Sequence, residues 1–226
     1  MDYRHELKFL VSDAQLEMIR YRLKALMRQD LHQKDGIYTV RSLYFDDFGN
    51  SCMEENENGI DNRRKYRIRI YDGNDGVIKL EKKIKCRGMT RKVSREISRK
   101  DCLLYMSGKA PLLAPDSAEL EKELYAEMKM SGMQPVTVVE YERCAFVEPR
   151  GNVRVTFDKN ISGSEAIGHF LDKKIMAVPL LPKGNHVLEV KYDELLPEYI
   201  AQALEISVLQ RTAFSKYYYA RNYKQN

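Results

Sequence analysis

KYRIRIY, residues 65 to 71, alternates between cationic and apolar side chains. Successive side chains of a β-strand point to opposite faces, so this stretch predicts a strand with one cationic and one apolar face. The two faces are made by alternate residues: Lys65, Arg67, Arg69 and Tyr71 on one, and Tyr66, Ile68 and Ile70 on the other. Such a cationic row is either solvated or lines a site for an anionic ligand, and the rest of the chain bears on that choice.

Strand patterns of this type recur along the chain, without the regular alternation of strand and helix that builds parallel sheets. We therefore expect a largely antiparallel sheet, curled or closed on itself. The predicted strands are Arg4–Leu10, Ile37–Asp46, Lys65–Tyr71, Val77–Lys85, Met89–Ser98, Val136–Val147, Val153–Asp158 and Val187–Tyr192.

Helical patterns lie between these strands. The first, Ser12–Arg28, begins with a Ser/Asp cap and carries one apolar stripe. The others are Arg99–Met106, Ser117–Met130 and a final segment from Pro197 to Tyr223, expected in two pieces. The prediction is an α+β fold in one domain, residues 1–226, with no internal repeat.

Composition narrows the class of protein. The 226 residues are 43% hydrophobic and 31% charged, which is typical of a globular chain, and no apolar run approaches the roughly 20 residues that span a bilayer. The beginning of the chain lacks the pattern of a secretory signal, so we expect a cytoplasmic protein. The four cysteines are scattered, which disfavours a zinc site or disulfides, and no catalytic-triad or glycine-rich phosphate-loop motif is present.

The charge of the chain is concentrated in one region. The net charge is +5, but residues 63–100 hold 15 Lys or Arg against 4 Asp or Glu. A focused field attracts ligands more strongly than total charge does, so this region predicts an anionic partner.

Three separate strands carry Glu-x-Lys, which places a carboxylate and an ammonium on one face: HELKF, KLEKKIK and HVLEVKY. If the eight strands closed with these faces inward, they would form a hydrophilic tunnel crowded with cations, and helices would cover the apolar faces outside. Such an interior repels itself unless it holds a polyanion. The ligand it fits is a phosphate chain, with Mg²⁺ or Mn²⁺ held by a carboxylate against the same phosphates.

At this point the motifs resemble a known family. They are, in order, RHELKF, SLYFD, YRIR, LEKK, YER, VRVTFD, VLEVKY and FSKYY, and together they span nearly the whole chain. This series resembles the vacuolar transporter chaperone (VTC) domain, the polyphosphate polymerase branch of the triphosphate tunnel metalloenzymes. The resemblance implies an eight-stranded antiparallel closed β-barrel tunnel that moves the terminal phosphoryl group of ATP to a polyphosphate chain, with Mn²⁺ or Mg²⁺ as cofactor.

The resemblance also implies roles for particular residues. Matched motif by motif, the phosphates would be held by Lys8, Arg67, Arg69, Lys83, Arg143, Arg154, Ser215 and Lys216, and the metal by Glu189. Glu6, Glu81, Arg91 and Lys191 complete the predicted ligand-binding set. The alignment that selects Arg91 could equally select Lys92. Lys65 shares the strand face but not the matched motif, so it is placed at the tunnel edge, outside the site.

One departure bears on the reaction. Other tunnel enzymes, triphosphatases and class IV adenylyl cyclases among them, resemble one another in a Glu-x-Glu-x-Lys near the start, and Arg4 stands here at the first of those Glu positions. The loss of that glutamate carboxylate favours the polymerase branch over a hydrolase with two metals.

Two alternative functions stay open: a tunnel triphosphatase, and a binding module for polyphosphate or RNA without catalysis. Carboxylates among the cations would weaken a nucleic-acid groove, so no specific nucleic acid is expected. A membrane-bound partner, the oligomeric state and the choice between Mg²⁺ and Mn²⁺ are not predicted.

Overall fold

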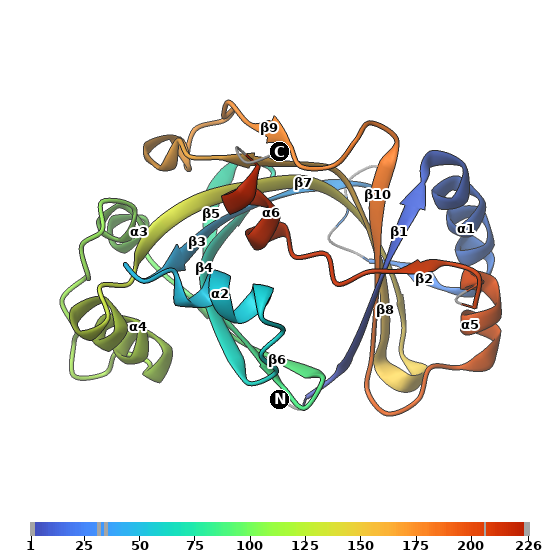
Figure 1. Ribbon diagram of the computed structural model, residues 1–226, viewed down its shortest axis with the longest axis horizontal. Coiled ribbons are helices and arrows are strands. Elements are labelled where there is room, and N and C mark those ends of the chain that lie inside the picture. Colours follow the sequence, from blue (N-terminus) through green and yellow to red (C-terminus); the bar gives the residue numbers. More distant parts are fainter. Residues whose placement is uncertain (1–2, 31–32, 34–35, 206, 224–226) are drawn as a thin grey trace.

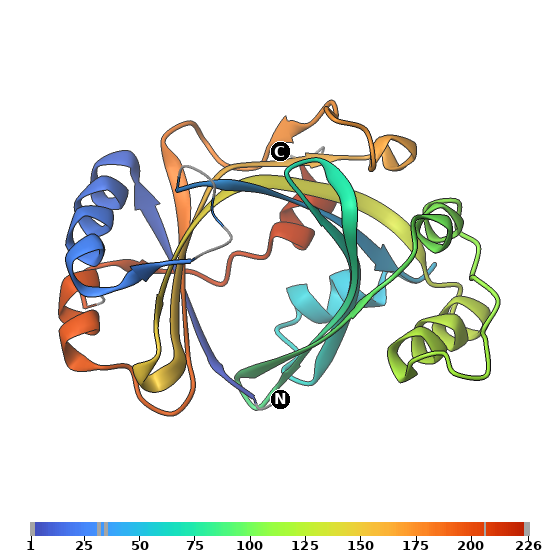
Figure 2. The ribbon, with the colours of Figure 1, turned by 180° about the vertical axis from the view of Figure 1, so that it is seen from behind.

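The computed structural model describes residues 3–30, 33, 36–205 and 207–223. It shows a mixed α+β fold built on one large antiparallel sheet that curls round on itself (Figures 1 and 2). Hydrogen-bonded neighbours follow the order β11-β1-β10-β8-β7-β3-β4-β5-β6. The strands are β1 (His5–Ser12), β2 (Arg28–Gln29), β3 (Tyr38–Asp46), β4 (Arg63–Tyr71), β5 (Asn74–Cys86), β6 (Met89–Glu96), β7 (Gln134–Glu148), β8 (Val153–Ser164), β9 (Val178–Pro179), β10 (Asn185–Tyr192) and β11 (Gln210–Arg211).

The eight predicted strands correspond to the eight long strands of this sheet. Their ends differ by a few residues, the largest difference being at β8, which continues from Asp158 to Ser164. The other three strands, β2, β9 and β11, have two residues each and were not predicted. Two residues are too few to show an alternating pattern, so sequence periodicity cannot reveal them.

A fully closed barrel, as predicted, is not confirmed. The first and last long strands of the order, β1 and β6, share no hydrogen-bonded ladder. Ahead of β1 the backbones of Arg4 and Thr90 form an isolated bridge, with two N–H···O bonds of 2.8 Å. The two ends of the sheet therefore meet at one bridge, because the strands diverge beyond it.

The helices are α1 (Asp13–Leu26), α2 (Ser51–Glu57), α3 (Arg99–Met106), α4 (Glu119–Met130), α5 (Glu198–Leu204) and α6 (Lys216–Asn222). Ser12 caps α1 in a capping box with Gln15, as the Ser/Asp pattern predicted. The final helical segment forms two pieces, α5 and α6. Helix α2 was missed, because its seven residues lack an apolar stripe and its N-cap, Asn50, makes no side-chain cap hydrogen bond.

Most helices cover the outer face of the sheet, as predicted. In Figure 1, α1 and α5 lie on one side of the molecule and α3 and α4 on the other. Leu16 and Leu23 of α1 are buried against Phe9, Val155 and the other outward apolar residues of β1, β8 and β10. Helices α3 and α4 bury a second set of apolar residues against Tyr66, Ile68 and Ile70 of β4 and their neighbours.

Helix α6 departs from the predicted arrangement. Its Tyr217 packs with Tyr44 and Tyr141, which lie on the inner face of the sheet, and it contacts β7, β8 and α2 (Figure 1). A helix with an apolar face must bury it, but its sequence does not say on which surface. This placement brings the N-terminal end of α6 to the concave side of the sheet. None of the helices in the described ranges is long and apolar enough to cross a membrane.

Candidate functional site: a cationic cavity inside the curled sheet

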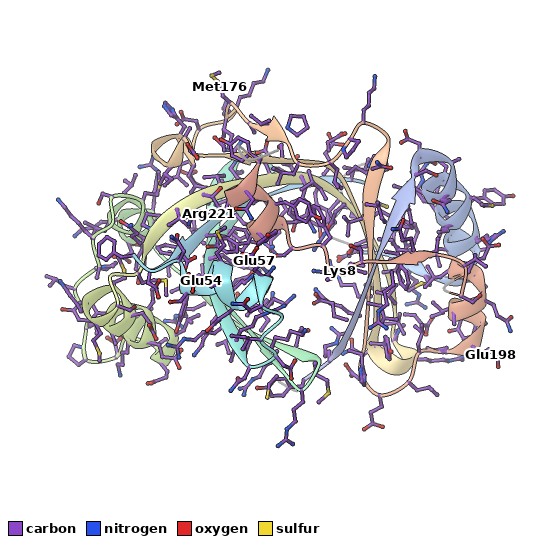
Figure 3. All side chains as sticks on the ribbon, in the orientation of Figure 1. Lys8, Glu54, Glu57, Met176, Glu198 and Arg221 are labelled. Carbon is purple, nitrogen blue, oxygen red and sulfur yellow. The ribbon has the colours of Figure 1, made fainter. Side chains whose placement is uncertain are left out.

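The concave side of the sheet encloses a cavity of about 1740 Å³. Strand periodicity explains its lining, because the alternate residues opposite the helix-covered face point into it. Figure 3 shows Lys8 reaching from β1 toward the centre of the molecule. All but one of the predicted site residues line the cavity: Glu6, Lys8, Arg67, Arg69, Lys83, Arg91, Arg143, Arg154, Glu189, Lys191, Ser215 and Lys216.

Two carboxylates and three lysines form a first cluster on β1, β5 and β10. Lys83 Nζ lies 2.8 Å from Glu6 Oε1, and Lys191 Nζ lies 2.6 Å from Glu189 Oε1. Lys8 Nζ joins both acids, at 3.3 Å from Glu6 and 3.9 Å from Glu189. Two complete Glu-x-Lys pairs, Glu6 with Lys8 and Glu189 with Lys191, therefore meet the lysine of the third pair, Lys83, at one place. The cluster has an excess of positive charge.

Burial alone would raise the pKa of Glu6 and of Glu189, but the surrounding cations reverse the shift. Lys83 lowers the pKa of Glu6, and Lys191 and Lys8 hold the pKa of Glu189 well below its ordinary value. The pKa of Lys83 falls to about 8, because burial and the neighbouring Lys8 and Lys191 outweigh its pairing with Glu6. Both carboxylates are therefore ionised at neutral pH.

A second cluster surrounds Glu81 of β5, the predicted site residue that does not line the cavity. Glu81 is 0% exposed. Its carboxylate accepts hydrogen bonds from Arg67 Nε at 2.7 Å and from Lys92 Nζ at 2.8 Å, and lies 3.6 Å from Arg69 Nη1. Arg69 also donates to Ser42 Oγ at 3.1 Å. Glu81 therefore positions cations that face the cavity and has no direct route to a ligand.

The register of β6 bears on the choice between Arg91 and Lys92. Lys92 pairs with Lys83 across the β5–β6 ladder, whereas Arg91 pairs with Ile84. Side chains opposite one another share a face, so Lys92 shares the inner face with Lys83, and Arg91, although exposed at the cavity border, shares the face of Ile84. The ladder therefore favours Lys92 over Arg91 as the ligand-binding residue of this strand.

A third cluster joins β7, β8 and α6. Asp158 is fully buried and accepts two hydrogen bonds from Arg143, at 2.6 and 2.8 Å, and Lys216 Nζ lies 2.6 Å from its second oxygen. Burial would raise the pKa of Asp158, but Arg143 and Lys216 lower it. The adjacent Ser215 Oγ caps α6 by accepting from the backbone of Tyr218.

Arg154 forms a separate ion pair on β8, at 2.5 Å from Asp30, and donates to Tyr38 Oη at 3.2 Å.

Sequence reasoning left several cavity residues out of the predicted site. Tyr44 Oη accepts from Arg67 at 3.2 Å, and Tyr141 Oη accepts from Arg69 at 3.2 Å. Tyr141 stands two positions before Arg143 and shares its strand parity, so periodicity carried a signal for it. Asp158 shares the parity of Arg154 in the same way, but it is buried beneath the cavity wall and does not line the cavity. Lys65, placed outside the site at first, lines the cavity.

The arrangement suits a ligand with many negative charges. Arg and Lys neutralise phosphate oxygens, and the carboxylates hold these cations in place without cancelling them. Within the described ranges, no three His, Cys, Asp or Glu side chains cluster in the manner of a metal site. Glu6 and Glu189, which share Lys8 and Lys191, nevertheless fit Mg²⁺ or Mn²⁺, since such ions commonly take one or two carboxylates together with phosphate oxygens.

The fold has relatives among solved structures of low sequence identity. A candidate adenylate cyclase from Bacillus halodurans has 13% identity and a TM-score of 0.55, and the match covers 92% of this chain and 88% of the other. A candidate adenylyl cyclase from Hippeastrum, described as having a dominant triphosphatase activity, has 12% identity and a TM-score of 0.53, with 98% and 96% covered. The PH1012 protein of Pyrococcus horikoshii has 15% identity and a TM-score of 0.50, with 94% and 96% covered.

The curled antiparallel sheet of this chain is thus a fold that it shares with these structures. Residues 3–223 match the VTC domain, and the chain belongs to that family. The resemblance drawn from the eight motifs is therefore confirmed. No curated protein matches the chain in sequence.

Proposed function

We propose that this protein is a polyphosphate polymerase-like phosphotransferase that moves the γ-phosphoryl group of ATP to a polyphosphate chain. The observation that carries the proposal is the convergence of the three charge clusters, around Glu6 and Glu189, Glu81, and Asp158, on one cavity. Cations outnumber carboxylates in each of them. A chain of phosphates could supply the missing negative charge along the length of the cavity.

The residues of the cavity would act by neutralising and aligning phosphates. Phosphoryl transfer needs little covalent help from the protein, because charge spreads over the equatorial oxygens of the transferred group. Arg67, Arg69 and Arg143 are held by buried carboxylates or hydroxyls, so their guanidinium groups are already ordered before the substrate arrives. A phosphate acceptor is deprotonated at neutral pH, so no general base is required.

Glu189, with Glu6 beside it, would hold Mg²⁺ or Mn²⁺. Such an ion would supply positive charge that neutralises the phosphate oxygens of the substrate. The two carboxylates are already ionised through their lysine neighbours, so no proton has to leave before a cation binds.

Arg4 supports a polymerase over a hydrolase. It pairs with Asp193 at 2.9 Å at the border of the cavity, where it adds a cation and not the carboxylate of the Glu-x-Glu-x-Lys pattern. The second candidate function is a tunnel triphosphatase, which the triphosphatase activity of the Hippeastrum protein favours.

A product assay separates these functions. The purified protein is incubated with ATP and Mn²⁺, and the products are resolved on a gel: long phosphate chains support the polymerase, orthophosphate alone supports the triphosphatase, and unchanged ATP means a binding module. Glu189→Ala and Arg67→Ala should abolish chain synthesis, and the control Lys82→Met, on the outer face of β5, should not. Full chain synthesis by both site variants would refute the proposed roles.

A further inference from the structure

Lys65 of β4 differs in its surroundings from the lysines of the three clusters. Lys8, Lys83, Lys191 and Lys216 each have a carboxylate oxygen within ion-pair distance. Lys65 lines the same cavity and is half-buried, yet it forms no ion pair with any residue in the described part of the chain. A buried ammonium without a counter-charge is costly, so an anionic ligand is the partner that this position fits.

The atoms around Lys65 Nζ are neutral hydrogen-bond acceptors. Nζ donates to Asn56 Oδ1 of α2 at 2.9 Å and to Ser215 Oγ, the N-cap of α6, at 3.5 Å. It lies 4.8 Å from the centre of the Tyr217 ring. Asn56 of α2, nine positions before Lys65, and Ser215 at the start of α6, 150 positions after it, therefore hold the amine at the cavity wall.

The charged groups facing Lys65 disfavour its ammonium form. Arg63 on its own strand, Lys83 on β5 and Lys8 on β1 are cationic, whereas Cys52 on α2 stays a neutral thiol because burial raises its pKa. Glu55 of α2 is a nearby carboxylate, and it forms no ion pair with Lys65 in the described part of the chain. Burial, followed by Arg63, lowers the pKa of Lys65 to about 7, despite the ring of Tyr217.

We propose that Lys65, with Asn56 and Ser215, forms a phosphate-binding subsite of the cavity, and that Lys65 takes up a proton when a phosphate chain enters. The chain supplies the counter-charge that the protein lacks, so the amine H₂N–R becomes H₃N⁺–R with a proton from solvent. No covalent bond to the ligand forms. This inference rests on the proposed phosphate-binding function and adds to it a residue that the family motifs do not contain.

The test is calorimetric titration of the protein with inorganic tripolyphosphate, without metal. It is repeated in buffers of different ionisation enthalpy, because the buffer dependence of the heat gives the number of protons taken up. The pH is about 8, where a lysine of pKa about 7 is mostly neutral. The variants are Lys65→Met, Lys65→Arg and the control Lys82→Met. Lys82 is matched because it also lies over a tyrosine ring, at 5.6 Å from Tyr66, but outside the cavity. Proton release by tripolyphosphate itself is common to all four proteins and cancels in the comparison.

The wild-type protein and Lys82→Met should take up about 0.9 proton more per bound chain than either Lys65 variant. Lys65→Met should bind at least about tenfold more weakly, because a charged hydrogen bond is lost. Between about pH 7 and 9 the affinity of Lys65→Arg, which cannot lose its charge, should fall less than that of the wild type, because Lys83 titrates in both proteins but Lys65 titrates only in the wild type.

Equal proton uptake by wild type and Lys65→Arg, or unchanged affinity in Lys65→Met, would overturn the subsite. A wild-type protein that shows the expected proton uptake but makes no phosphate chains would support Lys65 and refute the polymerase. Failure of the wild type to bind tripolyphosphate would refute both.

Discussion

Glu81→Gln is the perturbation that tests how the cavity holds its cations. Glu81 is 0% exposed, and its carboxylate forms ion pairs with Arg67, Lys92 and Arg69 at distances of 2.7, 2.8 and 3.6 Å. Glutamine keeps the shape of the side chain but removes its charge. Three cations would then face one another without a counter-charge, and breaking a buried ion pair from one side costs about 3–5 kcal/mol.

A loss of about 3 kcal/mol of unfolding free energy corresponds to a fall in Tm of roughly 6–12 °C for a domain of this size. The measurement is urea unfolding followed by circular dichroism, with Glu123→Gln as the matched control. Glu123 also pairs with a lysine of β5, at 2.8 Å from Lys82 Nζ, but it lies outside the cavity and is 36% exposed. The unfolding free energy of this control should fall by less than about 1 kcal/mol, because an exposed ion pair contributes little stability.

The same variant has a pH signature. Burial would raise the pKa of Glu81, but Arg67 and Arg69 lower it below its ordinary value of 4.5. A carboxyl group with a lowered pKa stabilises the folded state above about pH 4.5, and this contribution is lost as the pH falls. The difference in unfolding free energy between wild type and Glu81→Gln should therefore shrink below about pH 4.5.

Tripolyphosphate provides the decisive comparison. It should stabilise Glu81→Gln more than the wild type, because a bound anion replaces the missing charge, and a ligand at 100 times its Kd adds about 2.7 kcal/mol. A variant as stable as Glu123→Gln, or one that tripolyphosphate stabilises no more than it does the wild type, would refute the reasoning.

Three further predictions concern other parts of the structure. Lys92→Met should weaken tripolyphosphate binding about tenfold and Arg91→Met by much less, measured by calorimetry, because the β5–β6 ladder turns Lys92 inward; the reverse order would contradict the register argument. Arg41→Met should lower the free energy of unfolding, measured in urea, by about 3 kcal/mol, because Arg41 is 1% exposed and forms an ion pair with Glu140 on the outer face of the sheet. The folded variant should keep its activity, and a loss of activity would place Arg41 in the functional site. Tyr217→Phe should cost about 1 kcal/mol in the same assay, because its hydroxyl donates to Asp46, and an unchanged midpoint would mean that this hydrogen bond does not hold α6.

The sequence predicted the strands well because alternation over eight or more residues is a strong signal. It also predicts which side chains share a face, and Lys8, Arg67 and Glu189 do line one cavity. Register decides finer questions, and register depends on the whole sheet: Lys92 could be preferred over Arg91 only once its partner Lys83 was known.

Other features lie beyond sequence periodicity. Closure of the sheet depends on strand tilt and curvature, which no local pattern encodes. The inner position of α6 depends on the space left inside the sheet, although Tyr217 and Ala220 mark an apolar face. Lys65 lies outside the matched motifs, and its proposed role depends on Asn56 in α2, a helix too short to be predicted.

The pairing of β1 with β10 has a consequence for biosynthesis. Lys8 donates to the carbonyl of Phe214, a residue 206 positions away, and β1 borders β10 along its whole length. During translation the first strand emerges long before its hydrogen-bonding partner, and its backbone groups stay unpaired until residues 185–192 leave the ribosome. We expect slow folding, as for other proteins dominated by distant contacts, and a nascent chain whose first strand stays unpaired until β10 is made.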